Sequence, residues 1–108
     1  MIIHYHIKEQ SFIARIAAFN LRKDHAAIVI HRTIYLWGIS KADFQAQPRY
    51  VNHEFQHLYQ YYQIGTLRFL YEYLIESMHK GYSNNKFEIE ARNAETTTQL
   101  ADFVLLTK

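Results

Sequence analysis

The 108-residue sequence contains no cysteine, so disulfides are excluded and any bound metal ion must be held by histidine or carboxylate side chains. Three glycines and one proline are too few to mark a linker between two domains. No apolar run approaches the ~20 residues of a membrane span. The polar residues His4, His6 and Lys8 interrupt the amino-terminal stretch in which a signal peptide would be sought. We therefore expect a single domain over residues 1–108, cytoplasmic and without a membrane partner.

Charge is nearly balanced, with a net +2 from 12 basic and 10 acidic residues. Because there is no basic run and no basic stripe interleaved with aromatic residues, the sequence predicts no nucleic-acid partner. Apolar residues make up 49% of the chain and aromatic residues 16%, enough bulky side chains to keep water out of one small core.

The first half of the chain predicts a mixture of strand and helix. Residues 2–7 alternate loosely between apolar and polar side chains, as in a short strand or an ordered arm. After Ser11, a good helix cap, the apolar spacing becomes that of a helix ending near residues 20–21. The β-branched and aromatic runs Ala26–Ile30 and Thr33–Trp37 then predict a β-hairpin.

The second half predicts three helices. The first follows Pro48, which suits a first turn, and ends at Gly65, whereas the second ends at Gly81. The third is capped by Asn84 or Asn85. Each helix repeats apolar side chains on one face: Val51, Phe55, Leu58 and Tyr62 on the first; Leu67, Leu70, Tyr71, Leu74 and Met78 on the second; Phe87, Ala91 and Ala94 on the third. The predicted fold class is therefore α+β, an N-terminal helix and short hairpin followed by three helices.

Within the first of these helices, His53–His57 reads His-Glu-x-x-His. Residues i and i+4 lie on one helix face about 6 Å apart along the axis, so two imidazoles at that spacing can bind one zinc ion at about 2.0–2.1 Å. Glu54 lies about 100° further round the helix, badly placed as a ligand but within reach of a water molecule on the ion. The pattern therefore predicts a zinc site with His53 and His57 as two of its ligands.

A zinc site that performs chemistry needs three protein ligands and one open position. Because the chain has no cysteine, the third ligand must be a histidine, aspartate or glutamate from another segment. The third predicted helix opens with Phe87–Ala91, which contains Glu88 and Glu90. These two glutamates lie about 200° apart on a helix, so only one of them can bind the same ion.

Together these segments resemble a small gluzincin, the class of zinc peptidases with His-Glu-x-x-His on one helix and a glutamate ligand on a later one. The sequence is similar to small bacterial metallopeptidase-like domains with a strand hairpin, an HExxHxxQ helix, a second helix and a GYxxNxFExEA segment. The matching residues are His53–Gln60 and Gly81–Ala91, within a similarity over residues 26–95. The resemblance implies a zincin-like fold, a Zn²⁺ cofactor and a peptide or protein substrate.

The resemblance also implies roles for single residues. It maps the third zinc ligand onto Glu88, with Glu90 as the fallback. The aspartate that orients a histidine ligand in related gluzincins is Arg92 here. Asn85, Glu90 and Glu95 are the candidates to orient the histidine in place of that aspartate, and the sequence does not choose among them.

The implied reaction is hydrolysis of a peptide bond. Glu54 would take a proton from the zinc-bound water and deliver it to the leaving amine. Tyr82 is the first candidate to donate a hydrogen bond to the tetrahedral oxyanion, ahead of Tyr50 and Tyr59. Related enzymes bind an extended substrate along an exposed strand edge, for which Thr33–Trp37 is the candidate. The alternative function is a zinc-binding or protein-interaction module without turnover.

Overall fold

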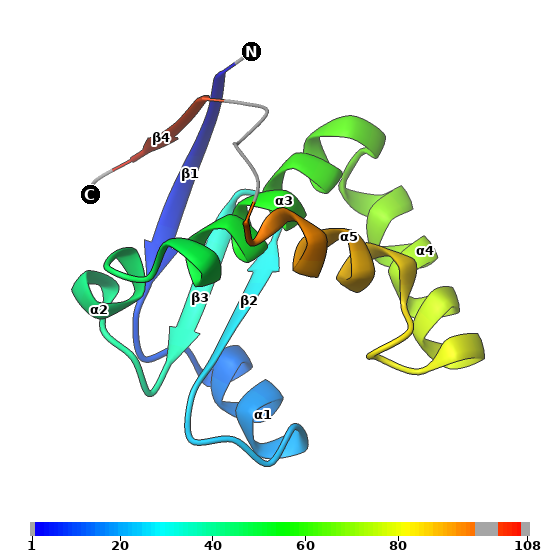
Figure 1. The fold of residues 1–108 in the computed structure, drawn as a ribbon, viewed down its shortest axis with the longest axis horizontal. Helices are drawn as coiled ribbons and strands as arrows, with labels where there is room; N and C mark the ends of the chain where they lie inside the picture. Colours follow the sequence, from blue (N-terminus) through cyan, green and yellow to red (C-terminus); the bar gives the residue numbers. More distant parts are fainter. Residues whose placement is uncertain (1, 97–101, 107–108) are drawn as a thin grey trace.

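The computed structural model describes residues 2–96 and 102–106, which form an α+β domain of the predicted class (Figure 1). Its elements are β1 (Ile2–Lys8), α1 (Phe12–Asn20), β2 (Ala26–Ile30), β3 (Thr33–Trp37), α2 (Lys41–Gln45), α3 (Pro48–Ile64), α4 (Thr66–Lys80), α5 (Lys86–Ala94) and β4 (Asp102–Leu105). Among the described residues, no helix combines the length and hydropathy that crossing a membrane requires.

The predicted helix ends are found where local chemistry favours them. The Ser11 hydroxyl accepts a hydrogen bond from the Ala14 N–H and caps α1. Pro48 is the first residue of α3. Asn85, rather than Asn84, caps α5, because its side-chain oxygen accepts the Phe87 N–H at 2.8 Å. Pro48 and the Asn85 cap thus set where α3 and α5, the helices that carry His53, His57 and Glu88, begin.

The strands form one sheet in the order β2-β3-β1-β4. β2 and β3 make the predicted antiparallel hairpin, whereas β1 runs parallel to both β3 and β4. Residues 2–8 are thus an interior strand and not an arm. β4 was not predicted, and Figure 1 shows it beside β1, at the opposite edge of the sheet from β2.

The prediction that Thr33–Trp37 offers a free sheet edge is wrong, because β3 is paired on both of its sides.

The free edge beside α3 belongs to β2. The hairpin turns over two residues, and His31 has a φ of 59°, as at the first central position of a type II′ turn. The two residues that flank such a turn, Ile30 and Thr33, form a hydrogen-bonded pair. Along the ladder, pairs with hydrogen bonds then alternate with pairs without them, so Val29 and Ala27 belong to the pairs without them. The backbone N–H and C=O groups of Ala27 and Val29 therefore point away from β3, toward the free edge.

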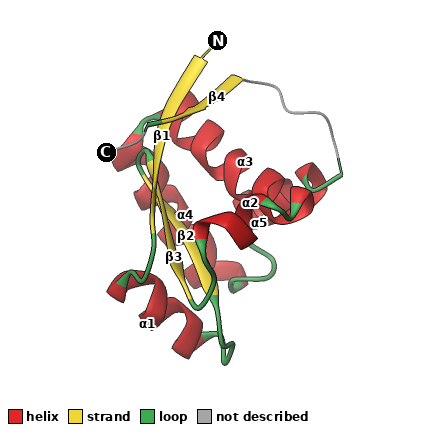
Figure 2. Ribbon diagram, turned by 90° about the vertical axis from the view of Figure 1, so that its left-hand side faces the viewer, coloured by secondary structure: helices red, strands yellow, loops and turns green. Residues whose placement is uncertain are grey.

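Helices cover both faces of the sheet. α3 crosses one face, where the fully buried Ile34 and Leu36 of β3 join a core cluster with Phe55. Trp37 points to the opposite face of β3, and the Arg15 guanidinium of α1 lies over its ring at 5.1 Å. Figure 2 shows α1 and α3 on different sides of the strands. Because β2 is an edge strand, a hollow beside it can be lined by helices from both layers.

The apolar stripe predicted for α3 is correct at Phe55 and Leu58 and wrong at Tyr62, which is 58% exposed. Tyr61 is buried in its place and donates a hydrogen bond from its hydroxyl to the Val29 carbonyl at 2.9 Å. The stripe fails toward the C-terminal end because α3 there turns its neighbouring face to the edge strand β2.

α4 packs with the face opposite to the predicted one. Phe69 is buried and Tyr73 half-buried, and the Phe69 ring lies 4.2 Å from that of Tyr61 and 4.8 Å from that of Phe87. The five residues of the predicted face are 40–83% exposed: Leu67, Leu70, Tyr71, Leu74 and Met78. Both faces of this helix carry large apolar side chains, so periodicity alone does not determine which one is buried.

Candidate metal centre

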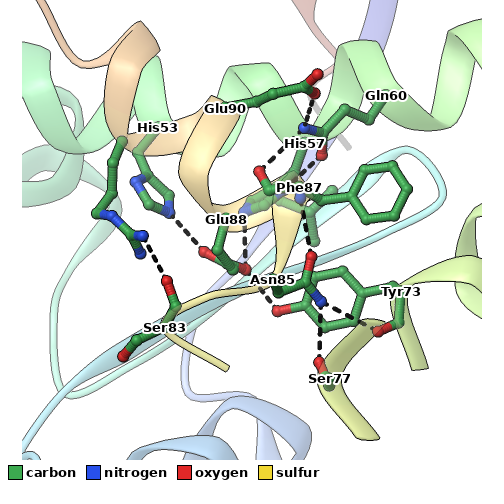
Figure 3. A network of polar contacts seen from close by, with 12 residues as sticks. His53, His57, Gln60, Tyr73, Ser77, Ser83, Asn85, Phe87, Glu88 and Glu90 are labelled. Atoms are coloured by element: carbon green, nitrogen blue, oxygen red, sulfur yellow. Dashed lines mark hydrogen bonds and ion pairs between the residues drawn. The ribbon is translucent and has the colours of Figure 1, made fainter. Parts of the chain in front are cut away.

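Helices α3 and α5 bring His53, His57 and Glu88 together (Figure 3). The Nε2 atom of His53 lies 3.1 Å from Oε1 of Glu88, and Nε2 of His57 lies 3.2 Å from Oε2. One ligand atom from each of the three residues lies within 4.8 Å of the others. Glu90, the fallback ligand, instead accepts a hydrogen bond from Gln60. Within the described residues, the structure therefore groups Glu88, and not Glu90, with the two histidines.

The geometry of this cluster fits a metal ion. Ligand atoms bound tetrahedrally at about 2.1 Å from one ion lie about 3.4 Å apart. The nitrogen-to-oxygen separations of 3.1 and 3.2 Å, one to each oxygen of Glu88, are close to that value, and the three ligand atoms lie within 4.8 Å of one another. His57 and Glu88 are buried and His53 is nearly so, which keeps the three side chains in fixed orientations. The group can thus hold one metal ion through two imidazole nitrogens and one carboxylate.

The second nitrogen of His53 is also held in place. Its Nδ1–H donates to Oε2 of Glu95 at 2.9 Å. A carboxylate can only accept, so this bond leaves Nε2 as the nitrogen that faces Glu88. Glu95 therefore takes the position that an aspartate at Arg92 was expected to fill. Arg92 itself donates to the Ser83 carbonyl and so ties down the loop next to Tyr82.

His57 is oriented by an uncharged partner, Gln60. The Gln60 side-chain nitrogen donates to the Phe87 carbonyl at 3.1 Å and to Oε1 of Glu90 at 2.8 Å. Since the amide nitrogen is committed to these acceptors, its oxygen accepts the Nδ1–H of His57 at 2.8 Å. Figure 3 shows this chain of contacts from Glu90 to His57. Glu90 therefore supports a histidine and does not itself approach the cluster.

Glu88 is held from the α4 side as well. The Tyr73 hydroxyl donates to Oε2 of Glu88 at 2.5 Å. The Asn85 side-chain nitrogen donates to the Tyr73 carbonyl and to the Ser77 hydroxyl, which fastens the start of α5 to α4. Three helices thus fix the carboxylate at the centre of the cluster.

The electrostatics of the cluster favour an ionised Glu88. Burial opposes ionisation, but hydrogen bonds from His53 and His57 outweigh it and hold the pKa of Glu88 well below its usual range. Burial likewise opposes charge on the histidines. Contacts with Glu88 and the nearby Glu54 nevertheless raise the pKa of His53 to about 9 and raise that of His57. Without a metal ion, the site therefore pairs an anionic carboxylate with protonated imidazoles at neutral pH, and a bound cation would take the place of the protons on the two Nε2 atoms.

Glu54 lines the same hollow as the three candidate ligands and is 5% exposed. Burial raises its pKa to about 7, with partial compensation from the neighbouring His57 and His53. A carboxyl group with a pKa near neutrality can both accept and release a proton at physiological pH. Glu54 is thus a buried carboxyl group beside the metal-binding group, with a pKa near neutrality.

Two hollows meet at this point, one of about 210 Å³ toward α4 and one of about 360 Å³ toward the start of α3. Tyr82 lines both of them and is 46% exposed. Burial of its hydroxyl and the charges of Glu88 and Glu54 raise the pKa of Tyr82, so the phenol remains a hydrogen-bond donor. Of the other two candidate donors, Tyr50 lines the larger hollow as well and packs edge-on against Phe44, whereas Tyr59 lines neither hollow.

Comparison with known proteins finds no matching family model, no matching curated protein and no matching solved structure. The likeness to gluzincins therefore rests on the motif residues and on the cluster they form.

The roles of two residues of the site were not predicted. Gln60 is the last residue of the HExxHxxQ motif and stands three residues after His57, on the same side of the helix, but the sequence assigned it no contact with His57. Tyr73 carried no signal, because the apolar periodicity of α4 predicts that the opposite face is buried. Only the packing of α4 against α5 shows that Tyr73 reaches Glu88.

Proposed function

We propose that this protein is a zinc-dependent metallopeptidase of the gluzincin type, with His53, His57 and Glu88 as its zinc ligands. The observation that carries the proposal is the convergence of both histidine Nε2 atoms on one buried carboxylate, while each Nδ1 donates to its own acceptor. Two imidazoles, one glutamate and an open fourth position are a ligand set of catalytic zinc sites, and structural sites more often use four protein ligands.

The residues around the cluster supply the remaining parts of a hydrolytic site. A zinc ion bound there would polarise the scissile carbonyl and acidify a water molecule. Glu54 would accept the proton of the attacking water and pass it to the leaving amine, since it lines the same hollow as the three candidate ligands. Tyr82 lies beside Glu54 in both hollows and donates a hydrogen bond to the developing oxyanion.

The first test separates zinc binding from turnover. Purified protein should contain about one zinc per chain by elemental analysis, and His57→Ala should lose it. Glu54→Gln should keep the zinc while its cleavage of a fluorogenic peptide library falls by about 10²–10⁴-fold, the usual contribution of a general base. Glu72→Gln is the matched control, because that carboxylate pairs with Arg68 on α4 and lines neither hollow.

Each outcome supports or contradicts the proposal. A native protein that does not bind added zinc contradicts it, as does a Glu54→Gln variant that cleaves peptides as well as the wild type. A protein that binds one zinc yet cleaves nothing across broad libraries supports the alternative function, a zinc-binding interaction module.

A further inference from the structure

The two hollows that meet at Glu54 differ in chemistry. The hollow toward α4 has an apolar wall made by Leu21 at the end of α1 and by Phe69 and Leu70 on α4. The hollow toward the start of α3 is lined by the cationic side chains of Lys23 and Arg49. A ligand that spans the metal cluster therefore contacts an apolar surface on one side and a basic surface on the other.

Two acidic residues share the basic hollow with Lys23 and Arg49, so its formal charges balance, but among the described residues neither carboxylate pairs with Lys23. Glu95 is its acidic member besides Glu54, and one Glu95 oxygen accepts from His53 while the other lies 3.4 Å from Arg49. Lys23 is exposed, and among the described residues it forms no ion pair. Lys23 is therefore available to a negatively charged ligand.

The edge strand β2 runs along both hollows, which together form one cleft, and its chain direction distinguishes the two ends of this cleft. Ala26 lines only the basic hollow, Ala27 lines both, and Ile28–Ile30 line only the apolar one. β2 thus runs from the basic end to the apolar end. At the apolar end the Val29 carbonyl already accepts from Tyr61, so in the described part of the chain the outward backbone groups of Ala27 remain for an incoming strand.

An incoming peptide that pairs antiparallel with β2, the more stable arrangement per residue, runs in the opposite sense. Its N-terminal part then lies in the apolar hollow and its C-terminal part in the basic one. A hollow of about 210 Å³ has room for a leucine or phenylalanine side chain. A carboxylate side chain that follows would lie within reach of Lys23.

We propose that the substrates are peptides with a large apolar residue on the N-terminal side of the scissile bond and an acidic residue on the C-terminal side. This specificity rests on the proposed peptidase function, since it concerns the same cleft. Lys23 and Leu70 are the residues that determine it, one for each half of the cleft.

The test measures binding separately from turnover. The probes are four fluorescent peptides of equal length, with Leu-Glu, Glu-Leu, Leu-Lys or Gly-Glu at the central positions, titrated into zinc-loaded Glu54→Gln protein. The Leu-Glu peptide should bind at least about 10-fold more tightly than the Glu-Leu and Gly-Glu peptides, the scale at which a filled apolar pocket discriminates. It should bind about 2–5-fold more tightly than the Leu-Lys peptide, as expected of an exposed ion pair.

Matched variants assign each preference to its residue. Lys23→Glu should invert the order of the Leu-Glu and Leu-Lys peptides, whereas Lys8→Glu, which changes another exposed lysine that lies outside both hollows, should leave it unchanged. Leu70→Gln should abolish the preference for leucine over glycine. Leu74→Gln, on the same helix but outside the hollows, should preserve it.

The inference is overturned if Glu-Leu binds as well as Leu-Glu, if no peptide binds, or if Lys23→Glu behaves like the wild type. A wild-type enzyme that cleaves all four peptides equally well also overturns it, while the peptidase proposal stands. The converse result is also possible: the Glu54→Gln protein binds the Leu-Glu peptide selectively, but the wild type cleaves no peptide. The peptidase proposal then fails, while the proposed peptide preference stands.

Discussion

At the scale of single residues, the two histidines are supported by different chemistry. His53 donates to a carboxylate, Glu95, and His57 donates to the amide of Gln60. A charged acceptor raises the basicity of an imidazole more than a neutral one does. We therefore expect His53 to be the stronger electron donor of the pair, and Gln60 to act mainly by fixing the orientation of its ring.

Removing either support should weaken metal binding without abolishing it. Gln60→Ala and Glu95→Ala are each expected to lower zinc affinity by about 10–100-fold, the range typical of partners that orient metal ligands. A competition titration with a chromophoric chelator measures this directly. Gln63→Ala is the control, because Gln63 is an exposed glutamine on the same helix. Unchanged affinity in both alanine variants would show that the histidines are oriented by packing alone.

How far single residues can be predicted depends on whether their spacing lies within one element. His53, Glu54 and His57 lie on one helix, so their geometry follows from the helical repeat. Glu88 needed the motif of a second segment, and Glu95 was one of three alternatives that the spacing left open. Tyr73 depends on how two helices pack, which no local pattern encodes.

At the scale of elements, α1 ends in a conformation that costs free energy. The Lys23 N–H bonds to the Ala18 carbonyl and the Arg22 N–H to the Phe19 carbonyl, the two bonds of a Schellman motif. The residue at the left-handed position is Arg22, with a φ of 56°, where glycine is usual. A side chain there is strained by roughly 1–2 kcal/mol.

Replacing Arg22 with glycine should therefore stabilise the protein. The relief of strain exceeds the added backbone entropy of glycine in the unfolded chain, so we expect a gain of about 0.5–1 kcal/mol in the free energy of unfolding. Urea denaturation followed by circular dichroism measures it. Arg22→Ala keeps a Cβ and should show no such gain, and an equal gain in both variants would assign the effect to the lost charge.

The elements differ in how clearly the sequence predicts them. The hairpin, α1, α3 and α5 carry caps, turn residues or several repeats of an apolar pattern, and these were predicted. α2 and β4 contain five and four residues, too few for periodicity to appear. α4 was recognised as a helix, but it carries two apolar faces and the prediction selected the wrong one.

At the scale of the whole molecule, the position of β2 matters most for function. Gly38, just after β3, has a φ of 74°, and a Cβ there would lie 2.2 Å from the Asp24 carbonyl oxygen. This close approach holds the segment before β2 against the end of β3. Neither the sheet order nor this contact could be inferred from local patterns, because both join distant segments.

The parallel pairing of β1 with β4 has a consequence for the order of folding. Ile2 pairs with Asp102, 100 residues further along the chain, and Phe103 stacks on Phe55 of α3 at 4.2 Å. Local pairs such as the hairpin form early, whereas pairing over so long a separation waits until the intervening chain is compact.

We therefore expect β4 to be the last strand to join the sheet and the first to leave it. Native-state hydrogen exchange should show the β4 amides opening at a lower free energy than the bonded amides of β2. Equal protection in both strands would mean that β4 separates only when the whole domain unfolds. Since β4 lies at the edge of the sheet opposite β2, its opening should leave the cleft intact. The protein should therefore retain its metal ion while the amide protons of β4 exchange with solvent.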